Sequence, residues 1–465
     1  MARFFVQNFG CRATQADGDA IERQFLKRGW LRADAPADAG IVVLNTCTVT
    51  ASADQDARAT IRRIHRENPE CRIVVTGCYA QRAPQEIAAL TGVQLVIGNS
   101  HKHAVAEIAA GTSSFVSLSQ LTANPAIHVS DIFAHTELLS APVFDSGHER
   151  TRPNLKVQDG CDNRCSFCVI PSVRGRSRSL PLSRILAEVH ALVTAGYREV
   201  VISGINLGRW GRDLAGSHPL PAAGEAATRS GGPTTNLGRS LFENLIRTIL
   251  LETSLEKLRL SSVEPMDWSD GLIRLMAESS RIAKHAHVPL QSGSDRVLRL
   301  MHRKYRPWHY REKIEKIRAA MPTAAIGADV MVGFPGEAEA DFEQTRRMID
   351  DLPFTYLHVF TYSARPETPA ASMPNQVPLH VARERNQILR ELATGKKLAF
   401  MRSLIGRPVE AITLNRTQSR PDGHFTEALT DNFLKLLVPG RHAANHWVKA
   451  HPEQVVGEVL VSRAS

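Results

Sequence analysis

Short apolar runs alternate with longer amphipathic stretches through the first hundred residues. Four runs rich in β-branched and aromatic residues are typical of buried strands: residues 3–8, 40–44, 72–75 and 93–97. Helical patterns separate them, at residues 19–29, 53–67 and 84–90. Strands that alternate with helices predict a parallel sheet with helices on both faces. We therefore expect residues 1–111 to form an α/β domain.

The same alternation returns after residues 112–150, whose weak periodicity indicates a linker. Six further runs predict strands, at residues 155–158, 199–203, 257–261, 284–290, 325–332 and 356–360. Six strand–helix units over residues 151–380 predict an open or partial (β/α)6 barrel, related to the eight-fold barrel. Residues 211–240 are rich in Gly, Pro, Ala, Ser and Thr, which predicts a flexible inserted loop.

The pattern changes again near the C-terminus. A long helical pattern over about residues 379–403 leads to short strand-like runs at residues 409–414, 425–430, 433–438, 447–450 and 455–461. Five short strands in so few residues predict a small OB-like β-barrel. With its connecting helix, this third unit takes residues 381–465, so the chain is predicted to be an α/β multidomain protein.

The charge balance favours a polyanionic partner. There are 57 Lys and Arg against 47 Asp and Glu, which gives a net charge of +10. From Arg383 onward, 13 basic residues face 8 acidic ones, with Phe425, Phe433 and Trp447 interleaved. Such aromatics can stack on nucleic-acid bases; alternatively they form the core of the small barrel, and the basic surplus is an ordinary solvated surface.

Targeting signals are not evident. No apolar stretch approaches the roughly 20 residues that span a bilayer, and the N-terminus turns polar at once. We therefore expect a cytoplasmic protein that does not act at a membrane. Seven cysteines are an odd and sparse set for a chain of 465 residues, which argues against a disulfide framework.

Three of the cysteines occupy equivalent positions in the first domain. Cys11, Cys47 and Cys78 each follow a predicted strand by one to three residues. Because the carboxyl ends of parallel strands share one edge of a sheet, these three side chains are expected to converge there. Cys71 precedes its strand, so we interpret it as a residue that binds no metal.

The remaining cysteines form a compact motif directly after the first strand of the central unit. Cys161, Cys165 and Cys168 have the spacing C-x3-C-x2-C. Closely spaced thiolates bind zinc or iron–sulfur clusters. Structural zinc needs four ligands, and His148 and His190 are the nearest histidines. Three ligands favour an iron–sulfur cluster with one open iron, with zinc or unligated structural cysteines as the alternatives.

Several other residues have two interpretations each. Five arginines surround this motif and are candidates to grip phosphates, or else form a solvated basic loop: Arg164, Arg174, Arg176, Arg178 and Arg184. His285 and His287 alternate on a predicted strand, which favours packing or hydrogen bonding over metal binding. We predict no catalytic residue beyond the cluster ligands.

The C-x3-C-x2-C motif after a barrel strand resembles that of the radical S-adenosylmethionine enzymes. The resemblance implies that Cys161, Cys165 and Cys168 hold a [4Fe-4S] cluster whose open iron binds S-adenosylmethionine. Reductive cleavage in that superfamily gives methionine and a 5′-deoxyadenosyl radical. Four residues fall where the superfamily holds S-adenosylmethionine, although turn or buried polar roles are equally compatible with each: Ser203, Gly204, Glu264 and Gln291.

Further motifs resemble the MiaB-like methylthiotransferases. They lie at residues 9–11, 45–50, 77–81, 157–161, 169–175, 287–294 and 333–337. The C-terminal unit resembles the TRAM domain, an RNA-binding module of that family. By this resemblance, Cys11, Cys47 and Cys78 hold a second [4Fe-4S] cluster. In the family, one S-adenosylmethionine methylates sulfur on this auxiliary cluster, and another supplies the radical that activates the substrate.

The resemblance also implies the partners. Residues 45–54 and 76–81 look most like the branch that modifies carbon 2 of threonylcarbamoyladenosine beside the anticodon, so the expected partner is the anticodon stem-loop of tRNA. Residues 12–14 depart from the Lys-Val-Asn usual in that branch. An electron donor and a sulfur donor are also implied, without identity.

Three alternatives stay open. The first two are methylthiolation of isopentenyladenosine in tRNA and of an aspartate in a ribosomal protein. The third is a non-catalytic iron–sulfur protein that binds RNA as a redox sensor.

Overall fold

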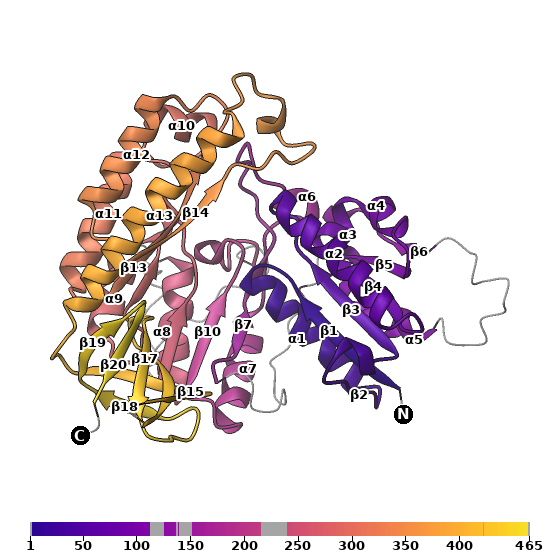
Figure 1. Ribbon diagram of the computed structural model, residues 1–465, viewed down its shortest axis with the longest axis horizontal. Helices are drawn as coiled ribbons and strands as arrows, with labels where there is room; N and C mark the ends of the chain where they lie inside the picture. The colour runs from indigo at the N-terminus through magenta and orange to yellow at the C-terminus, as the bar shows by residue number, and fades with distance from the viewer. Residues whose placement is uncertain are drawn as a thin grey trace, which may run out of the picture.

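The computed structural model describes residues 2–111, 125–135, 138, 151–214, 240–421 and 423–463. Most of the predicted linker at residues 112–150 and of the predicted loop at residues 211–240 lies outside the described residues. Figure 1 shows the N-terminal sheet in indigo and purple beside a central α/β unit in magenta to orange, with a yellow C-terminal sheet at one end of the central unit.

The N-terminal sheet has six strands, all paired in parallel, in the order β2-β1-β3-β4-β5-β6. Its strands are β1 (Arg3–Asn8), β2 (Leu31–Arg32), β3 (Ile41–Thr46), β4 (Arg72–Gly77), β5 (Val93–Gly98) and β6 (Ala126–His128). The connecting helices are α1 (Arg12–Leu26), α2 (Ala51–Glu67), α3 (Cys78–Arg82), α4 (Pro84–Ala88) and α5 (Val105–Gly111). The predicted parallel α/β sheet is confirmed.

Both faces of this sheet are covered because successive residues of its strands point to opposite sides. In β3, Val42 and Leu44 pack in one apolar cluster, while Ile41 and Val43 pack in another. The sequence pattern did not predict β2 or β6. The first is two residues long, and the second falls within the segment that we predicted as a linker.

The central unit contains six parallel strands in two three-stranded sheets, β11-β10-β7 and β12-β13-β14. Isolated bridges from Leu258 to Ile282 and from Ser262 to His287 connect the two sheets. The strands are β7 (Asn154–Lys156), β10 (Glu199–Ser203), β11 (Lys257–Leu260), β12 (His285–His287), β13 (Ala325–Val332) and β14 (Tyr356–Thr361). A short antiparallel pair, β8 (Gln158–Asp159) and β9 (Arg178–Ser179), follows β7.

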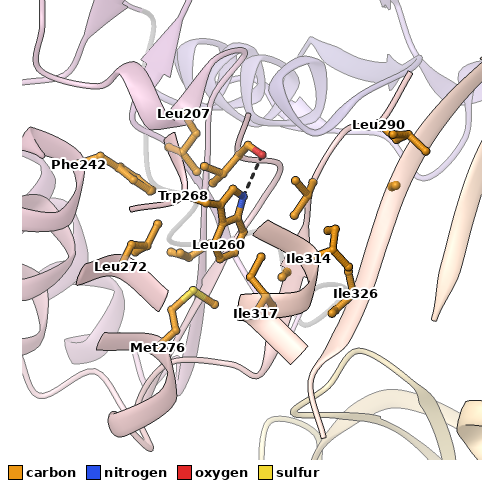
Figure 2. Packing of buried hydrophobic residues seen from close by; sticks show 14 of the residues in the cluster. Leu207, Phe242, Leu260, Trp268, Leu272, Met276, Leu290, Ile314, Ile317 and Ile326 are labelled. Carbon is orange, nitrogen blue, oxygen red and sulfur yellow. Dashed lines mark hydrogen bonds between the residues drawn. The ribbon is translucent and has the colours of Figure 1, made fainter. Parts of the chain in front are cut away.

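Helices cover one face of these strands. They are α7 (Leu182–Thr194), α8 (Leu241–Glu252), α9 (Asp270–Glu278), α10 (Asp295–Leu300), α11 (Pro307–Ala320) and α12 (Glu339–Asp351). The short helix α6 (Ile170–Arg174) instead packs against the N-terminal sheet domain. Apolar strand residues such as Leu260 and Ile326 pack against the helices in one large core. Figure 2 shows part of this core around Trp268, whose indole Nε1 donates a hydrogen bond to the Val263 carbonyl at 3.1 Å.

The opposite face of the same strands is polar. We call it the inner face, and it carries Asn154, Lys156, Glu199, Ser203, Lys257, Arg259, His285, His287, Asp329, Tyr356 and His358. Parallel strands buried on both faces are ordinarily apolar on both. A polar inner face therefore indicates that this side of the central unit serves binding or chemistry.

The C-terminal part begins with α13 (Leu379–Arg402) and continues in a curled six-stranded sheet, in the order β18-β15-β16-β17-β20-β19. Its strands are β15 (Val409–Arg420), β16 (Gly423–Thr430), β17 (Lys435–Pro439), β18 (Trp447–Ala450), β19 (Pro452–Val456) and β20 (Val459–Ser462). We predicted five strands. The last predicted run forms two because a turn at Gly457, with φ of +59°, interrupts it.

The three aromatics that we considered for base stacking all contact other side chains of the protein. Phe425 belongs to a small apolar cluster of the C-terminal sheet. Phe433 lies 4.6 Å from the ring of His285, centroid to centroid, and the Trp447 ring lies 5.3 Å from Lys257 Nζ. Phe425 is therefore a core residue, whereas Phe433 and Trp447 are partly buried against the central unit, and base stacking by these two rings stays a prediction. Within the described residues, no helix combines the length and apolar character of a membrane span.

Candidate metal centres

Cys11, Cys47 and Cys78 come together beyond the carboxyl ends of adjacent strands. Cys11 caps the start of α1 after β1, Cys47 follows β3, and Cys78 opens α3 after β4. Burial, together with the nearby Cys78 and Cys11 sulfurs, raises the pKa of the Cys47 thiol to about 12. Such a thiol is a metal ligand only when a bound metal displaces its proton, and the clustering of Cys47 with Cys11 and Cys78 fits that chemistry.

The surroundings of this first cysteine set also fit a bound cluster. Asn99 Nδ2 donates to Cys78 Sγ at 3.5 Å, and Thr14 Oγ1 lies 3.5 Å from Cys11 Sγ. Gly10, with φ of +91°, lies so close to Cys47 that an added Cβ would be 2.8 Å from its sulfur. Hydrogen-bond donors near sulfur and room for close approach are features of iron–sulfur sites.

Cys71 lies apart from this set. It precedes β4, whereas Cys78 follows the same strand, so the length of β4 separates the two thiols. Cys71 is 2% exposed and packs in an apolar cluster of the N-terminal sheet. Burial raises the pKa of its thiol.

The second cysteine set lies in the loop between β8 and α6. The backbone N–H of Asn163 donates to Cys161 Sγ at 3.4 Å, and Asn206 Nδ2 approaches the same sulfur at 3.7 Å. Burial, reinforced by Cys165 and Cys161, raises the pKa of Cys168 to about 12. Three clustered sulfurs with converging donors again fit a metal cluster rather than free thiols.

Arg303 is a residue of this second site that the sequence analysis missed. Its guanidinium donates to Cys165 Sγ at 3.4 Å and also pairs with the Glu264 carboxylate. It is 8% exposed and follows α10, far along the chain from the cysteine motif. Nothing in the local sequence distinguishes it from other loop arginines, so only the fold identifies it.

The four residues predicted to hold S-adenosylmethionine lie at or beyond neighbouring strand ends. Ser203 ends β10 and is buried, and its hydroxyl has no hydrogen-bond partner among the described residues. A Cβ on Gly204 would be 2.8 Å from the side-chain oxygen of Gln158. Glu264 follows β11, and Gln291 follows β12 in a left-handed conformation with φ of +62°. Their common edge is the edge that also carries the second cysteine set.

Helix α6 connects the two cysteine sets. Val169, next to Cys168, packs with Val173 and with Cys78 of the first set in one small cluster. Both sets therefore lie at the junction of the N-terminal sheet and the central unit. Both candidate clusters therefore lie next to one short helix.

A group of five buried ionic side chains fills the same junction. This interdomain charge network consists of Asp17, Lys102, Lys156, Asp159 and Arg174. Arg174 binds Asp17 at 3.0 Å and Asp159 at 2.9 Å, while Lys102 binds Asp17 at 2.9 Å. Lys156 pairs with both carboxylates. A cavity of about 350 Å³ adjoins the network. Arg174 also lies within electrostatic range of Cys78 and Cys11.

This network corrects one of our predictions. Arg174 is 2% exposed, so it cannot grip a phosphate. Arg178 donates to the carbonyls of His135 and Arg174. The remaining three arginines, Arg164, Arg176 and Arg184, are exposed. The sequence signal for the network was a charged residue inside an apolar strand run, Lys156, which pairs with Asp17 in another domain and with nearby Asp159.

Comparison with known proteins agrees with this picture. Residues 3–98 match the model of a family described as uncharacterized protein family UPF0004, and residues 155–349 match the radical SAM superfamily. A Bacillus subtilis protein named threonylcarbamoyladenosine tRNA methylthiotransferase MtaB is 34% identical, over 95% of this chain and 91% of the relative. A tRNA-2-methylthio-N(6)-dimethylallyladenosine synthase 1 from Mycobacterium marinum is also 34% identical, over 92% of this chain and 79% of the relative.

Solved structures show the same fold. The radical S-adenosylmethionine methyltransferase TsrM from Kitasatospora setae superposes with a TM-score of 0.55, at 15% identity, over 80% of this chain and 75% of that one. The radical SAM superfamily match implies S-adenosylmethionine and a [4Fe-4S] cluster. From the matched models and the relatives aligned over nearly their whole length, we conclude that this chain belongs to the MiaB-like methylthiotransferases, a family of radical S-adenosylmethionine enzymes.

Proposed function

We propose that this enzyme adds a methylthio group to carbon 2 of threonylcarbamoyladenosine beside the anticodon of tRNA. The proposal rests on one observation above all, the two cysteine sets that meet at α6. Cys78 of the first set packs against Val169, the neighbour of Cys168 in the second. Relatives that share this chain's full extent are named for this tRNA modification.

Each cysteine set has a separate role in this proposal. Cys161, Cys165 and Cys168 hold the [4Fe-4S] cluster of the radical reaction, and Cys11, Cys47 and Cys78 hold a second cluster that carries sulfur. When bound, the two clusters supply the electron that cleaves S-adenosylmethionine and the sulfur that is transferred. The chain itself orients them, because donors such as Arg303 and Asn99 point at individual sulfurs.

The ends of the central strands hold S-adenosylmethionine in this proposal, through Ser203, Gly204, Glu264 and Gln291. Glu264 is held in place by Arg303, which also contacts Cys165. One side chain therefore connects the cofactor edge to the cluster. We propose in addition that the central strands form a (β/α)6 partial barrel.

The C-terminal sheet is proposed to be a TRAM-type OB barrel that binds the RNA. Arg416, Lys435, Arg441 and Lys449 are exposed on this sheet. Phosphate contacts from these cations are proposed to carry the binding.

The test uses anaerobically reconstituted protein, S-adenosylmethionine, a strong reductant and tRNA that contains threonylcarbamoyladenosine. The wild type is expected to form the 2-methylthio nucleoside, which mass spectrometry of digested tRNA detects. Cys47→Ala should abolish sulfur insertion and keep part of the cleavage to 5′-deoxyadenosine, with Cys71→Ala as the matched control. Equal loss of both products in Cys47→Ala would contradict the division of roles. Product on isopentenyladenosine alone would overturn the substrate assignment.

A further inference from the structure

Most charged groups on the inner face have partners. Glu199 binds Arg259 at 2.6 Å and lies 3.6 Å from Arg152. His285 Nε2 lies 2.7 Å from the Tyr356 hydroxyl. These pairs lie near the N-terminal ends of the strands. The polar groups at that end of the inner face therefore have partners within the protein.

The C-terminal sheet closes this end. Phe433 lies at the turn between β16 and β17, with φ of +66°, and its ring stacks near His285 and 6.0 Å from Tyr356. Asp431 of the same turn lies 3.4 Å from Lys257, and its carbonyl accepts from Arg259 at 3.0 Å. The Phe433 turn thus forms a floor at this end of the inner face, and we call the part that it covers the recess. The other end of the inner face leads to the predicted S-adenosylmethionine edge.

Three nitrogen-bearing side chains above this floor lack such partners. Arg12 extends from the start of α1, 5.8 Å from the Phe433 ring, and its guanidinium makes no hydrogen bond or ion pair with a described residue. His287 is 9% exposed, and neither ring nitrogen has a hydrogen-bond partner among the described residues. His358 lies beside it, with ring centroids 5.8 Å apart, and makes no hydrogen bond in the described part of the chain.

His287 is buried, and an unpartnered buried ring nitrogen is costly, so it indicates a ligand. Arg12 is partly buried and His358 is exposed, which leaves both accessible to that ligand. Asp329 Oδ1 lies 3.3 Å from His287 Nε2. The ligand atoms of His287, Asp329 and His358 all lie within 4.8 Å of one another, a spacing that would also suit a divalent metal ion.

The local charge favours an anion over a metal ion. Four cations, on Arg12, Arg152, Arg259 and Lys257, face three carboxylates, on Glu199, Asp329 and Asp431. Arg12 and Arg259 lie against the same Phe433 ring, at 5.8 and 5.5 Å from its centroid, so cations crowd this recess. A dication would add to the repulsion among these cations, whereas a carboxylate would relieve it.

The recess also adjoins the reacting region. The Asp329 carbonyl accepts a hydrogen bond from the Gln291 backbone at 2.8 Å, and Gln291 is at the proposed cofactor edge. A nucleoside held at this edge could thus extend a substituent down to His287 and His358.

From this geometry, we infer that Arg12, His287 and His358 bind the carboxylate of the threonylcarbamoyl group, while Asp329 positions His287. The inference rests on the proposed function and adds the residues that select the substrate. It also explains the exchange at position 12 within the family motif, because arginine keeps the cation there and offers a planar fork to the carboxylate.

Binding of three anticodon stem-loops tests this inference without turnover. The cluster-loaded enzyme is titrated without reductant against stem-loops that carry threonylcarbamoyladenosine, its methyl ester or isopentenyladenosine. The ester replaces the charged carboxylate oxygen with a neutral methoxy group. We expect the wild type to bind the acid about ten- to hundredfold more tightly than the ester, as for a charge-assisted pair out of water.

The variants isolate the individual groups. Arg12→Met and His358→Gln should lose most of the preference for the acid and bind the ester nearly as the wild type does, whereas Arg12→Lys should retain part of it. Arg390→Met and His380→Gln make the same changes at exposed positions of α13 and should keep the full preference. Iron content, measured for every variant, excludes loss of the clusters as the cause.

Each contrary result has its own meaning. Equal weakening for all three stem-loops would make Arg12 and His358 structural and overturn the inference. An unchanged preference in both variants would also overturn it, while methylthiolation of threonylcarbamoyladenosine by the wild type would leave the proposed function standing. One additional equivalent of zinc, bound by the wild type and lost in His358→Gln, would make the group a metal site. Activity on isopentenyladenosine alone would refute the proposed function itself.

Discussion

At the scale of single residues, the position of a cysteine relative to its strand separates two kinds of thiol. Cys78 follows β4 and lies near Cys47, whereas Cys71 precedes β4 and packs among apolar side chains. The two are only seven positions apart in the chain, but a strand of this length spans about 20 Å. The distance between two cysteines along the sequence is thus a poorer guide to shared metal binding than their positions in the sheet.

This difference predicts that serine variants of Cys71 and Cys78 contain different amounts of iron. Cys71→Ser should keep all of the iron of the anaerobically purified enzyme and cost about 1 kcal/mol of stability, because it places a hydroxyl in an apolar cluster. Cys78→Ser should lose about half of the iron, the share of one of two clusters. Iron and sulfide analysis measures both, and iron loss in Cys71→Ser would show that our grouping of the cysteines is wrong.

At the scale of elements, the turn between β16 and β17 joins the C-terminal sheet to the central strands. Phe433 adopts a left-handed backbone conformation, which is rare for a bulky residue. The guanidinium of Arg259 lies 5.5 Å from its ring centroid, and Asn432 donates to the Thr323 carbonyl at 2.9 Å. Such a conformation persists only where the surrounding contacts hold it.

Removing the Phe433 ring should weaken the attachment of the C-terminal sheet to the central unit. We expect Phe433→Ala to cost about 1–3 kcal/mol, from lost packing and lost cation–π contacts, and to expose the α13 connection to limited proteolysis. Trp308→Ala removes a ring that is 58% exposed and serves as the control. If both variants melt and digest like the wild type, the turn does not anchor the C-terminal sheet.

At the scale of the whole molecule, the interdomain charge network holds the N-terminal sheet against the central unit. Burial alone would raise the pKa of Asp17, but Lys102, Lys156 and Arg174 outweigh it and lower the pKa to about 2. Asp159 is likewise held ionised, since Arg174 and Lys156 outweigh its burial. Two carboxylates and three cations compensate one another only while the domains stay docked.

The loss of stability at low pH, which is the acid limb of the stability curve, follows from this shift in the pKa of Asp17. The folded pKa of Asp17 lies below its unfolded value near 3.8, so its contribution is complete above about pH 4 and is lost as the pH falls toward 2. Asp17→Asn should therefore destabilise the apo-protein by about 3–5 kcal/mol near neutral pH and flatten this acid limb. Thermal unfolding from pH 3 to 7 measures both effects, with exposed Asp34→Asn as the control. An acid limb unchanged in Asp17→Asn would place the pH dependence elsewhere.

The sequence by itself predicted the parallel N-terminal sheet, the six central strand positions and the family. Strand and helix periodicities are local properties, and the strand-end rule follows from parallel pairing alone. The roles of Arg174 and of the C-terminal aromatics Phe425, Phe433 and Trp447 were predicted less well. Their roles depend on which surfaces dock, and a lone arginine or phenylalanine carries no sign of that in its neighbours.

Only the tertiary structure decided which distant charges meet. Asp17 pairs with Lys102, 85 positions away, and with Arg174, 157 positions away, and Arg12 reaches a recess that Phe433 closes from the far end of the chain. These contacts require domains to dock, and their energy depends on burial that no single segment provides. For that reason the cysteine positions could be read from the chain, while the groups that surround the proposed clusters and substrate could not.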